Sequence, residues 1–279
     1  MPFEVTDLHS HSTASDGALT PAALVARAHE FGVTDLALTD HDTLSGLDEA
    51  RHAADQHGIR LVNGIELSVL AESREIHVLG LWVNPHDERL VSLVDAQQQA
   101  RIDRAKLIGK RLDRAAGMAN SYEKACVLAE SPAPGRPLFA RMLMENNKVR
   151  DMRHAFNRYL KQGQSAYVAT PWCELSVAVD AIHHAGGCAV LAHPHAYSLT
   201  RKRLRQLLGE FKLAKGDAME VMVPGLTMQQ QNLLNECWQH FELKVSGGSD
   251  FHSPEQRWLS LGRLPPVPTG ATPVWQDYR

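Results

Sequence analysis

The sequence predicts an α/β barrel that carries an inserted helical segment. Apolar segments typical of strands alternate with segments of helical periodicity, in units of about 25 to 30 residues. This alternation is typical of parallel strands that are joined by helices. It stops between residues 100 and 164, where only helical patterns occur.

The predicted strands are short and mainly apolar. They cover Phe3–Leu8, Asp35–Thr39, Arg60–Val62, Glu75–Trp82, Cys188–Ala192, Ala218–Val221 and Glu242–Ser246. The predicted helices of the alternating part cover Thr20–Phe31, Leu44–His57, Glu174–Ala185, Leu199–Leu213 and Thr227–His240. The first helix has clear boundaries, because Thr20 is a favourable N-cap, Pro21 suits the first helical position and Gly32 follows the end.

The segment 100–164 is expected to form a separate helical subdomain, so that the barrel comprises residues 1–99 and 165–279. Apolar residues recur at helical spacing from Ile102 to Ala115, and a second helical region runs from Leu138 to about Leu160. The segment holds 14 basic and six acidic residues, which leaves a net charge of −11 on the rest of the chain. A basic cap beside an acidic barrel suits an anionic substrate held between them. Alternatively, these cations lie on solvated helix faces.

Nine residues of metal-binding types are scattered over the chain, most of them at the ends of predicted strands. They are His9, His11, Asp16, His41, Glu66, His77, His193, Asp250 and His252. Side chains that follow the carboxyl ends of barrel strands converge at one face of the barrel. Imidazoles and carboxylates suit zinc, manganese or iron, and nine of them would serve a cluster of two or three ions. The sequence therefore predicts a metal-dependent hydrolase.

Composition excludes several other classes of protein. The hydrophobic content of 44% is ordinary for a globular protein, and no run of eighteen apolar residues occurs. The first residues lack the features of a signal peptide, so a cytoplasmic location and no membrane partner are expected. The four cysteines are far apart and indicate neither a disulfide framework nor a zinc knuckle. The net charge of −3 disfavours binding of long nucleic acid and favours a small anionic ligand. No obligatory protein partner is evident.

Six segments together resemble the successive motifs of the PHP (polymerase and histidinol phosphatase) superfamily. In order they are Asp7–Gly17, Ala37–Thr43, Gly64–Ser68, His77–Gly80, Ala192–Pro194 and Ser249–His252. The resemblance implies a distorted seven-stranded (β/α) barrel. The helical insert and the Gly135-Arg136-Pro137 turn resemble one branch of the superfamily. That branch contains bacterial phosphoesterases acting on nucleoside 3′,5′-bisphosphates and 5′→3′ exoribonucleases that trim short RNA.

The resemblance also implies three metal positions. The first position would use His9, His11 and Asp250, and Glu66 would bridge it to the second. The second position would also use His77 and His193. The third position would use Asp16, His41 and His252. Manganese is the expected metal, and the ligand set also accepts zinc or iron. Asp40 could orient a ligand imidazole. Arg136 is the candidate for binding a substrate phosphate, because its planar guanidinium pairs with phosphate oxygens.

Two positions depart from the pattern of the branch. His195 stands where relatives often have glycine; it could contact a phosphate, donate a proton to the leaving oxygen, or do neither. Leu138 stands where relatives commonly have histidine, which puts the exact substrate in question.

The implied reaction is attack of a metal-activated hydroxide on phosphorus, which removes the 3′-phosphate of a nucleoside 3′,5′-bisphosphate and leaves a nucleoside 5′-monophosphate. Trimming of short RNA from the 5′ end is a related activity. The alternatives are another small-molecule phosphatase, for example one acting on histidinol phosphate, and a non-catalytic PHP accessory domain.

Overall fold

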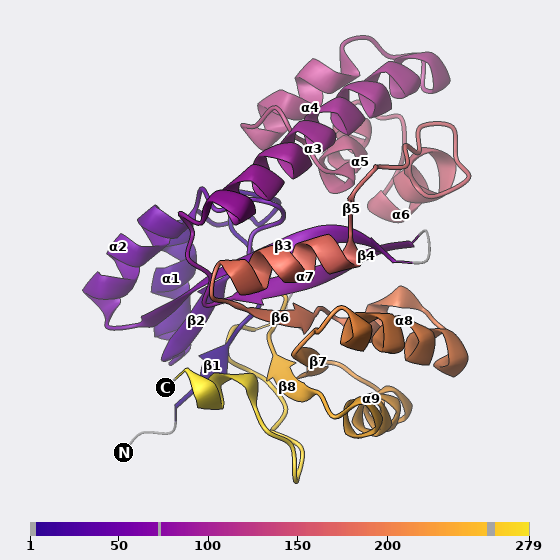
Figure 1. The fold of residues 1–279 in the computed structure, drawn as a ribbon. Coiled ribbons are helices and arrows are strands. Elements are labelled where there is room, and N and C mark those ends of the chain that lie inside the picture. The colour runs from indigo at the N-terminus through magenta and orange to yellow at the C-terminus, as the bar shows by residue number, and fades with distance from the viewer. Residues whose placement is uncertain (1–3, 72–73, 256–259, 279) are drawn as a thin grey trace. The chain divides into compact units, whose positions relative to one another are not determined.

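The computed structural model describes residues 4–71, 74–255 and 260–278. The chain divides into two compact units, one formed by Met1–Val94 with Cys173–Arg279 and the other by Asp95–Trp172. Figure 1 shows the strands in the first unit and a group of helices in the second. Phe3, where the first strand was predicted to begin, lies outside the described residues.

The first unit is built on a sheet whose main path runs β1–β2–β3–β4–β6–β7–β8, with β5 paired to β3 off this path. The strands are β1 (Thr6–Asp7), β2 (Asp35–Leu38), β3 (Arg60–Ala71), β4 (Arg74–Leu81), β5 (Cys173–Glu174), β6 (Cys188–Leu191), β7 (Ala218–Met222) and β8 (Lys244–Gly247).

Backbone hydrogen bonds between the ends of this path close the sheet. The N–H of Leu8 donates to the carbonyl of Gly247 at 3.1 Å, and the N–H of Asp250 donates to the carbonyl of His9 at 2.9 Å. Because these bonds join the residues after β1 to β8 and the residues after it, the seven strands of the path form a closed barrel. The predicted α/β barrel is thus confirmed.

The expectation that all barrel strands run parallel is wrong for β4. This strand is antiparallel to both of its neighbours, β3 and β6. Only two residues separate Ala71 from Arg74, and a parallel crossover needs a dozen or more. β3 also continues to Ala71, well beyond the predicted end at Val62, and apolar and polar residues alternate within this extension from Ile65 to Val69. The long antiparallel pair β3–β4 is the distortion of the barrel.

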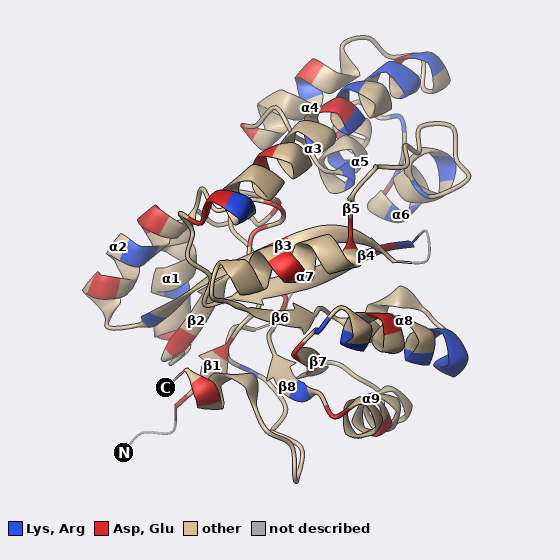
Figure 2. Cartoon of the chain, in the orientation of Figure 1, with Lys and Arg blue, Asp and Glu red and all other residues tan. Residues whose placement is uncertain are grey.

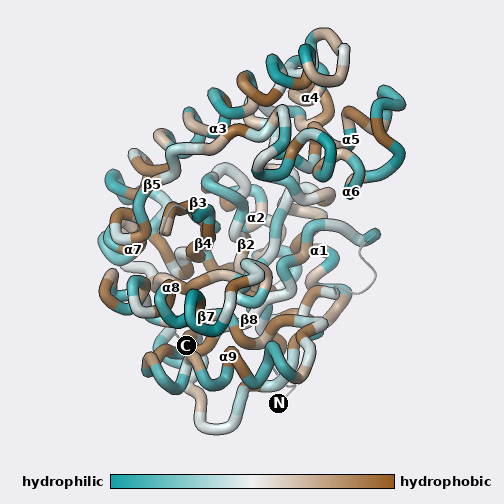
Figure 3. Tube along the Cα trace, turned by 90° about the vertical axis from the view of Figure 1, so that its right-hand side faces the viewer, coloured by the Kyte–Doolittle hydropathy of each residue, from teal (hydrophilic) through white to brown (hydrophobic). Residues whose placement is uncertain are grey.

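Helices cover the sheet of the first unit. They are α1 (Pro21–Glu30), α2 (Leu47–His57), α7 (Leu175–His184), α8 (Arg201–Leu213) and α9 (Met228–Phe241). The side chain of Thr20 caps the N-terminus of α1 as predicted, and Thr200 and Thr227 do the same for α8 and α9. Each helix buries one apolar face, as Leu204, Leu207, Leu208 and Phe211 do in α8. Figure 3 shows hydrophilic and hydrophobic residues alternating along these helices.

The second unit is helical. It contains most of α3 (Glu88–Ala115), together with α4 (Ser121–Ala129), α5 (Arg136–Glu145), α6 (Met152–Ala155) and a π-helical turn at Phe156–Leu160. Ile108, Leu112, Phe139 and Leu143 are fully buried in its own apolar cluster. Lys and Arg residues are frequent on its helices, as Figure 2 shows in blue. Among the described residues, no helix is long and apolar enough to cross a membrane.

Candidate metal centre

The structure brings the nine predicted ligand residues together in the first unit. His9 and His11 follow β1, His41 follows β2, His193 follows β6, and Asp250 and His252 follow β8. Glu66 and His77 instead lie within β3 and β4, because this hairpin extends past the strand ends of its neighbours. Asp16 comes from the loop after His11.

Glu66 lies at the centre of the cluster. Its side chain is buried, and five imidazole nitrogens lie within 3.4 Å of its two oxygens. These are Nδ1 of His77 (2.9 Å) and Nε2 of His193 (2.9 Å) at Oε1, and Nδ1 of His41 (3.0 Å), Nε2 of His11 (3.2 Å) and Nε2 of His9 (3.4 Å) at Oε2. A carboxylate with this many imidazoles can bridge neighbouring ions.

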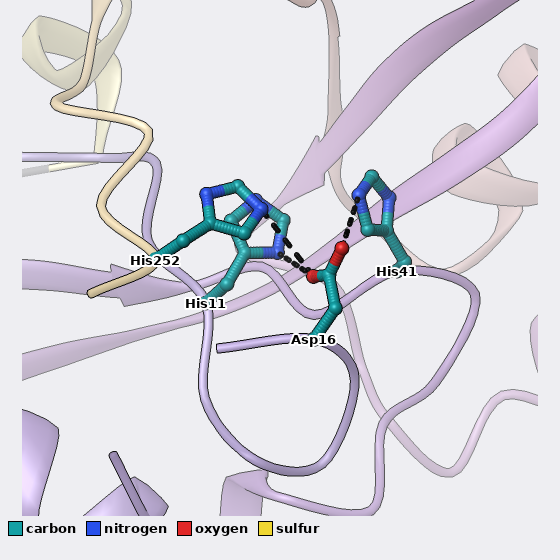
Figure 4. A group of neighbouring side chains, drawn as sticks. All are labelled: His11, Asp16, His41 and His252. Atoms are coloured by element: carbon teal, nitrogen blue, oxygen red, sulfur yellow. Dashed lines mark ion pairs between the residues drawn. The ribbon is translucent and has the colours of Figure 1, made fainter. Parts of the chain in front are cut away.

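A second group of candidate ligands surrounds Asp16, which Figure 4 shows between three imidazoles. Its Oδ1 lies 3.3 Å from Nε2 of His252 and 3.9 Å from Nδ1 of His11. Its Oδ2 lies 3.9 Å from Nε2 of His41. The carboxylate and the three imidazoles supply four ligand atoms, enough for one tetrahedral ion.

The ligand atoms fall into four overlapping groups in which all atoms lie within 4.8 Å of one another. The groups are His11, Asp16, His41 and His252; His9, Glu66 and His193; His9, His11 and Asp250; and His41, Glu66 and His77. They include the predicted first and third positions, and the predicted second pair, His77 and His193, meets at Glu66. Which residues hold which ion stays a prediction.

The donor set fits divalent metal ions. Nδ1 of His41 and Oε2 of Glu66 lie 3.0 Å apart, yet neither atom hydrogen bonds to any residue that the structure describes. Nδ1 of His11 is another buried atom without a hydrogen-bond partner among those residues. Buried polar atoms are costly when unsatisfied, and a metal ion would satisfy these lone pairs.

Burial and charge shift the pKa values of the cluster in a consistent way. Burial opposes ionisation of Glu66, but His41, His77 and His9 outweigh it and hold the pKa of Glu66 well below its ordinary value. Burial likewise opposes ionisation of Asp16, and nearby imidazoles again place its pKa well below the ordinary value. The carboxylates are therefore ionised and available as ligands.

Without metal ions, the protein is expected to lose thermal stability as the pH rises from about 6.5 towards 10. Burial disfavours protonated His11, but the carboxylates of Asp250 and Glu66, each 3.2 Å from its Nε2, outweigh it and raise the pKa of His11 to about 10. A group whose folded pKa is raised stabilises the protein fully below its unfolded pKa, and this contribution is lost as the pH rises through the folded pKa.

Bound ions replace the proton on a ligand imidazole, so the metal-loaded protein is expected to keep its Tm over the same range. Thermal melts at about pH 6.5 and about pH 9.5, with and without manganese, measure this difference. Equal losses of Tm in the two forms would contradict the prediction.

Asp40 holds the loop between His11 and Asp16 in place. Its carboxylate accepts hydrogen bonds from the backbone N–H of Ser12 at 2.8 Å, from the Ser12 hydroxyl at 2.6 Å and from the Ser15 hydroxyl at 2.5 Å. Within the described ranges no imidazole hydrogen bonds to it, so Asp40 shapes the loop that carries Asp16. Asp7, which the sequence analysis did not single out, accepts N–H bonds from Ser249 and Gly262 and fixes the chain next to Asp250.

Two further residues beside the centre were missed. Glu220 in β7 contacts His9 through a 2.9 Å hydrogen bond to Nδ1. Tyr197 accepts the backbone N–H of His77 and donates to the carbonyl of Ala192, at 2.9 Å in both cases. One signal for Glu220 was present in the sequence, since it is the single acid within an apolar strand.

The other two predicted site residues, His195 and Arg136, lie in different units of the chain. His195 lies in the 3₁₀ turn Pro194–Tyr197, directly after His193 and Pro194. Burial lowers its pKa, and its buried Nδ1 has no hydrogen-bond partner among the described residues. Arg136 is the first residue of α5, in the second unit.

Known proteins are similar to this chain in sequence and in fold. A model of the PHP domain matches residues 7–169. A 5′-3′ exoribonuclease of Haemophilus influenzae is 42% identical over 272 residues, covering 98% of both chains. A 3′,5′-nucleoside bisphosphate phosphatase of Chromobacterium violaceum is 36% identical, covering 97% of this chain and 95% of the relative.

A solved structure is also very similar. It is that of an amidohydrolase from Chromobacterium violaceum with bound sulfate and no metal, with a TM-score of 0.91 and 36% identity over 98% of this chain and 95% of that chain. The predicted enzyme class, a hydrolase of the phosphatase type, is confirmed by these relationships. The family match covers more than half of the chain, and the relatives extend over almost all of it. The chain therefore belongs to the PHP domain family.

Proposed function

We propose that this protein is a metal-dependent phosphoesterase that removes the 3′-phosphate of nucleoside 3′,5′-bisphosphates, giving a nucleoside 5′-monophosphate and phosphate. The observation that carries the proposal is the cluster of nine ligand residues around Glu66. The bisphosphate phosphatase among the relatives, 36% identical over nearly the whole chain, supports this substrate class.

The nine residues would hold two or three divalent ions, with manganese proposed and zinc or iron as alternatives. Such ions activate water for attack on phosphorus and neutralise the charge on the phosphoryl oxygens. The protein's own contribution is geometric. The carboxylate of Glu66 lies between the imidazoles. Asp40 holds the loop that carries Asp16, and Asp7 holds the chain next to Asp250, both through hydrogen bonds.

The helical subdomain 100–164 is proposed to bind the phosphates of the substrate. It carries a net charge of +8, opposite in sign to the rest of the chain. Within it, we propose Arg136 as the residue that pairs with the phosphate that is not cleaved.

A second candidate function is 5′→3′ trimming of short RNA. It is favoured by one observation, since the exoribonuclease of Haemophilus influenzae, at 42% identity, is more similar to this chain than the bisphosphate phosphatase. Both activities need the same metal centre and a binding site for a phosphorylated nucleotide end.

Incubation of manganese-loaded protein with adenosine 3′,5′-bisphosphate, followed by chromatography, tests the proposal. The expected products are adenosine 5′-monophosphate and phosphate, formed much faster than phosphate from histidinol phosphate. Short 5′-phosphorylated RNA, tested in parallel, distinguishes the second candidate. Activity on histidinol phosphate alone would contradict both candidates.

Replacing Arg136 by alanine is expected to raise the KM for the bisphosphate about 10- to 100-fold, because a charge-assisted pair with phosphate is lost. Hydrolysis of an aryl phosphate, which has no second phosphate, should change much less. Lys124→Ala removes one charge from an exposed position of the same unit and serves as the control. Equal losses on both substrates would rule out a role confined to the second phosphate.

A further inference from the structure

We propose that Glu220 is a positioning residue that fixes two metal ligands, His9 and His193, at the same time. The inference rests on the proposed metal-dependent function. Glu220 is 1% exposed and its two oxygens have different partners. Oε1 lies 2.9 Å from Nδ1 of His9, and Oε2 accepts the backbone N–H of His193 at 2.5 Å.

The contact with His9 determines which nitrogen of that ring faces the centre. A carboxylate at Nδ1 favours the tautomer that carries its proton there, which leaves the lone pair on Nε2. Nε2 is the atom that points to the cluster, since it lies 3.4 Å from Glu66 and 3.4 Å from Asp250. Glu220 therefore prepares His9 to bind a metal ion through Nε2.

The contact with His193 fixes a strained backbone. His193 has φ 30° and ψ 54°, in the left-handed region that residues other than glycine rarely adopt. Its N–H donates to Glu220, while its Nε2 lies 2.9 Å from Oε1 of Glu66. Since strained residues persist only where their surroundings hold them, the bond to Glu220 helps to keep this imidazole directed at the centre.

Glu220 lies directly before an irregularity in the sheet. It is in regular register with Ser246 of β8, and the register shifts between Glu220 and Met222. Such irregularities are frequent beside active sites. No Lys or Arg among the described residues forms an ion pair with Glu220, so its hydrogen bonds with Nδ1 of His9 and the N–H of His193 are what offset the cost of burying it.

Glu220→Gln is the most informative variant, because it keeps the size of the side chain. The amide oxygen can replace only one of the two carboxylate oxygens. Its NH₂ group would face either the N–H of His193 or the Nδ1–H of His9, both of which are donors in the wild type. We expect binding of one manganese ion to weaken about 10- to 100-fold, as measured by equilibrium dialysis with metal analysis.

The activity of Glu220→Gln should recover largely at saturating manganese, which a purely structural loss would not allow. Glu220→Asp keeps the charge but shortens its reach, and an intermediate metal affinity is expected. Glu236→Gln, an exposed acid in α9, is the matched control and should bind manganese like the wild type.

The outcomes separate this inference from the proposed function. If the wild type binds manganese and Glu220→Gln binds it equally well, the positioning role is wrong while the metal-dependent function stands. If the wild type binds no divalent ion, the proposed function fails and the inference fails with it. A lower Tm of the metal-free variant with unchanged metal affinity would reduce Glu220 to a structural residue and overturn the proposal.

Discussion

Replacement of Glu66 by glutamine is expected to reduce phosphatase activity at least about 1,000-fold and to weaken metal binding at more than one position. Five imidazoles lie around the carboxylate of Glu66, at nitrogen–oxygen distances between 2.9 and 3.4 Å. Glutamine has a similar shape but no charge, and one of its two polar atoms is a donor rather than a ligand. The substitution should therefore remove the proposed bridge while leaving the β3–β4 hairpin intact.

Metal content per chain and turnover of the bisphosphate measure this effect together. Glu49→Gln, an exposed acid of α2, makes the same chemical change away from the centre and should leave both quantities unchanged. Circular dichroism of the Glu66 variant should show an unaltered fold. Wild-type metal content in folded Glu66→Gln would mean that the carboxylate does not bridge ions.

Most of the fold could be predicted from the sequence, and so could the convergence of the nine candidate ligand residues, because both follow from local patterns. The strand predictions agree best with the structure where clear helix signals flank the strand. An example is β2 (Asp35–Leu38), which follows the helix that Thr20 caps. The antiparallel β4 was missed because periodicity reveals a strand but not its direction. The short connection between Ala71 and Arg74 indicates that β4 runs antiparallel to β3. The prediction ended the third strand at Val62, so the connection to the next strand seemed much longer than it is.

The supporting residues of the centre were harder to predict, because their roles depend on contacts distant in sequence. Glu220 meets His9 across 211 positions, and Asp7 meets Ser249 across 242. Neither pair leaves a local spacing that a sequence pattern could reveal. Asp40 was predicted to orient an imidazole because it precedes His41, but its hydrogen bonds lead to Ser12 and Ser15.

Asp16→Asn is expected to lower turnover about 100-fold or more and to remove one ion per chain, leaving the others bound. Asp16 is the only carboxylate in the group with His11, His41 and His252, so the remaining neutral imidazoles would hold a cation less tightly. Asp48→Asn, at an exposed position of α2, is the control. Normal turnover and full metal content in Asp16→Asn would show that this group holds no catalytic ion.

The same variant tests which of its two groups His41 serves. Nδ1 of His41 lies 3.0 Å from Glu66, while its Nε2 lies 3.9 Å from Asp16. A neutral imidazole has one lone pair, because its other nitrogen carries the proton, so His41 can serve the ion at Glu66 or the ion at Asp16 but not both. If His41 serves the Asp16 group, His41→Asn should lose the same single ion as Asp16→Asn, and the double variant should lose no more. If it serves Glu66, the two losses should add.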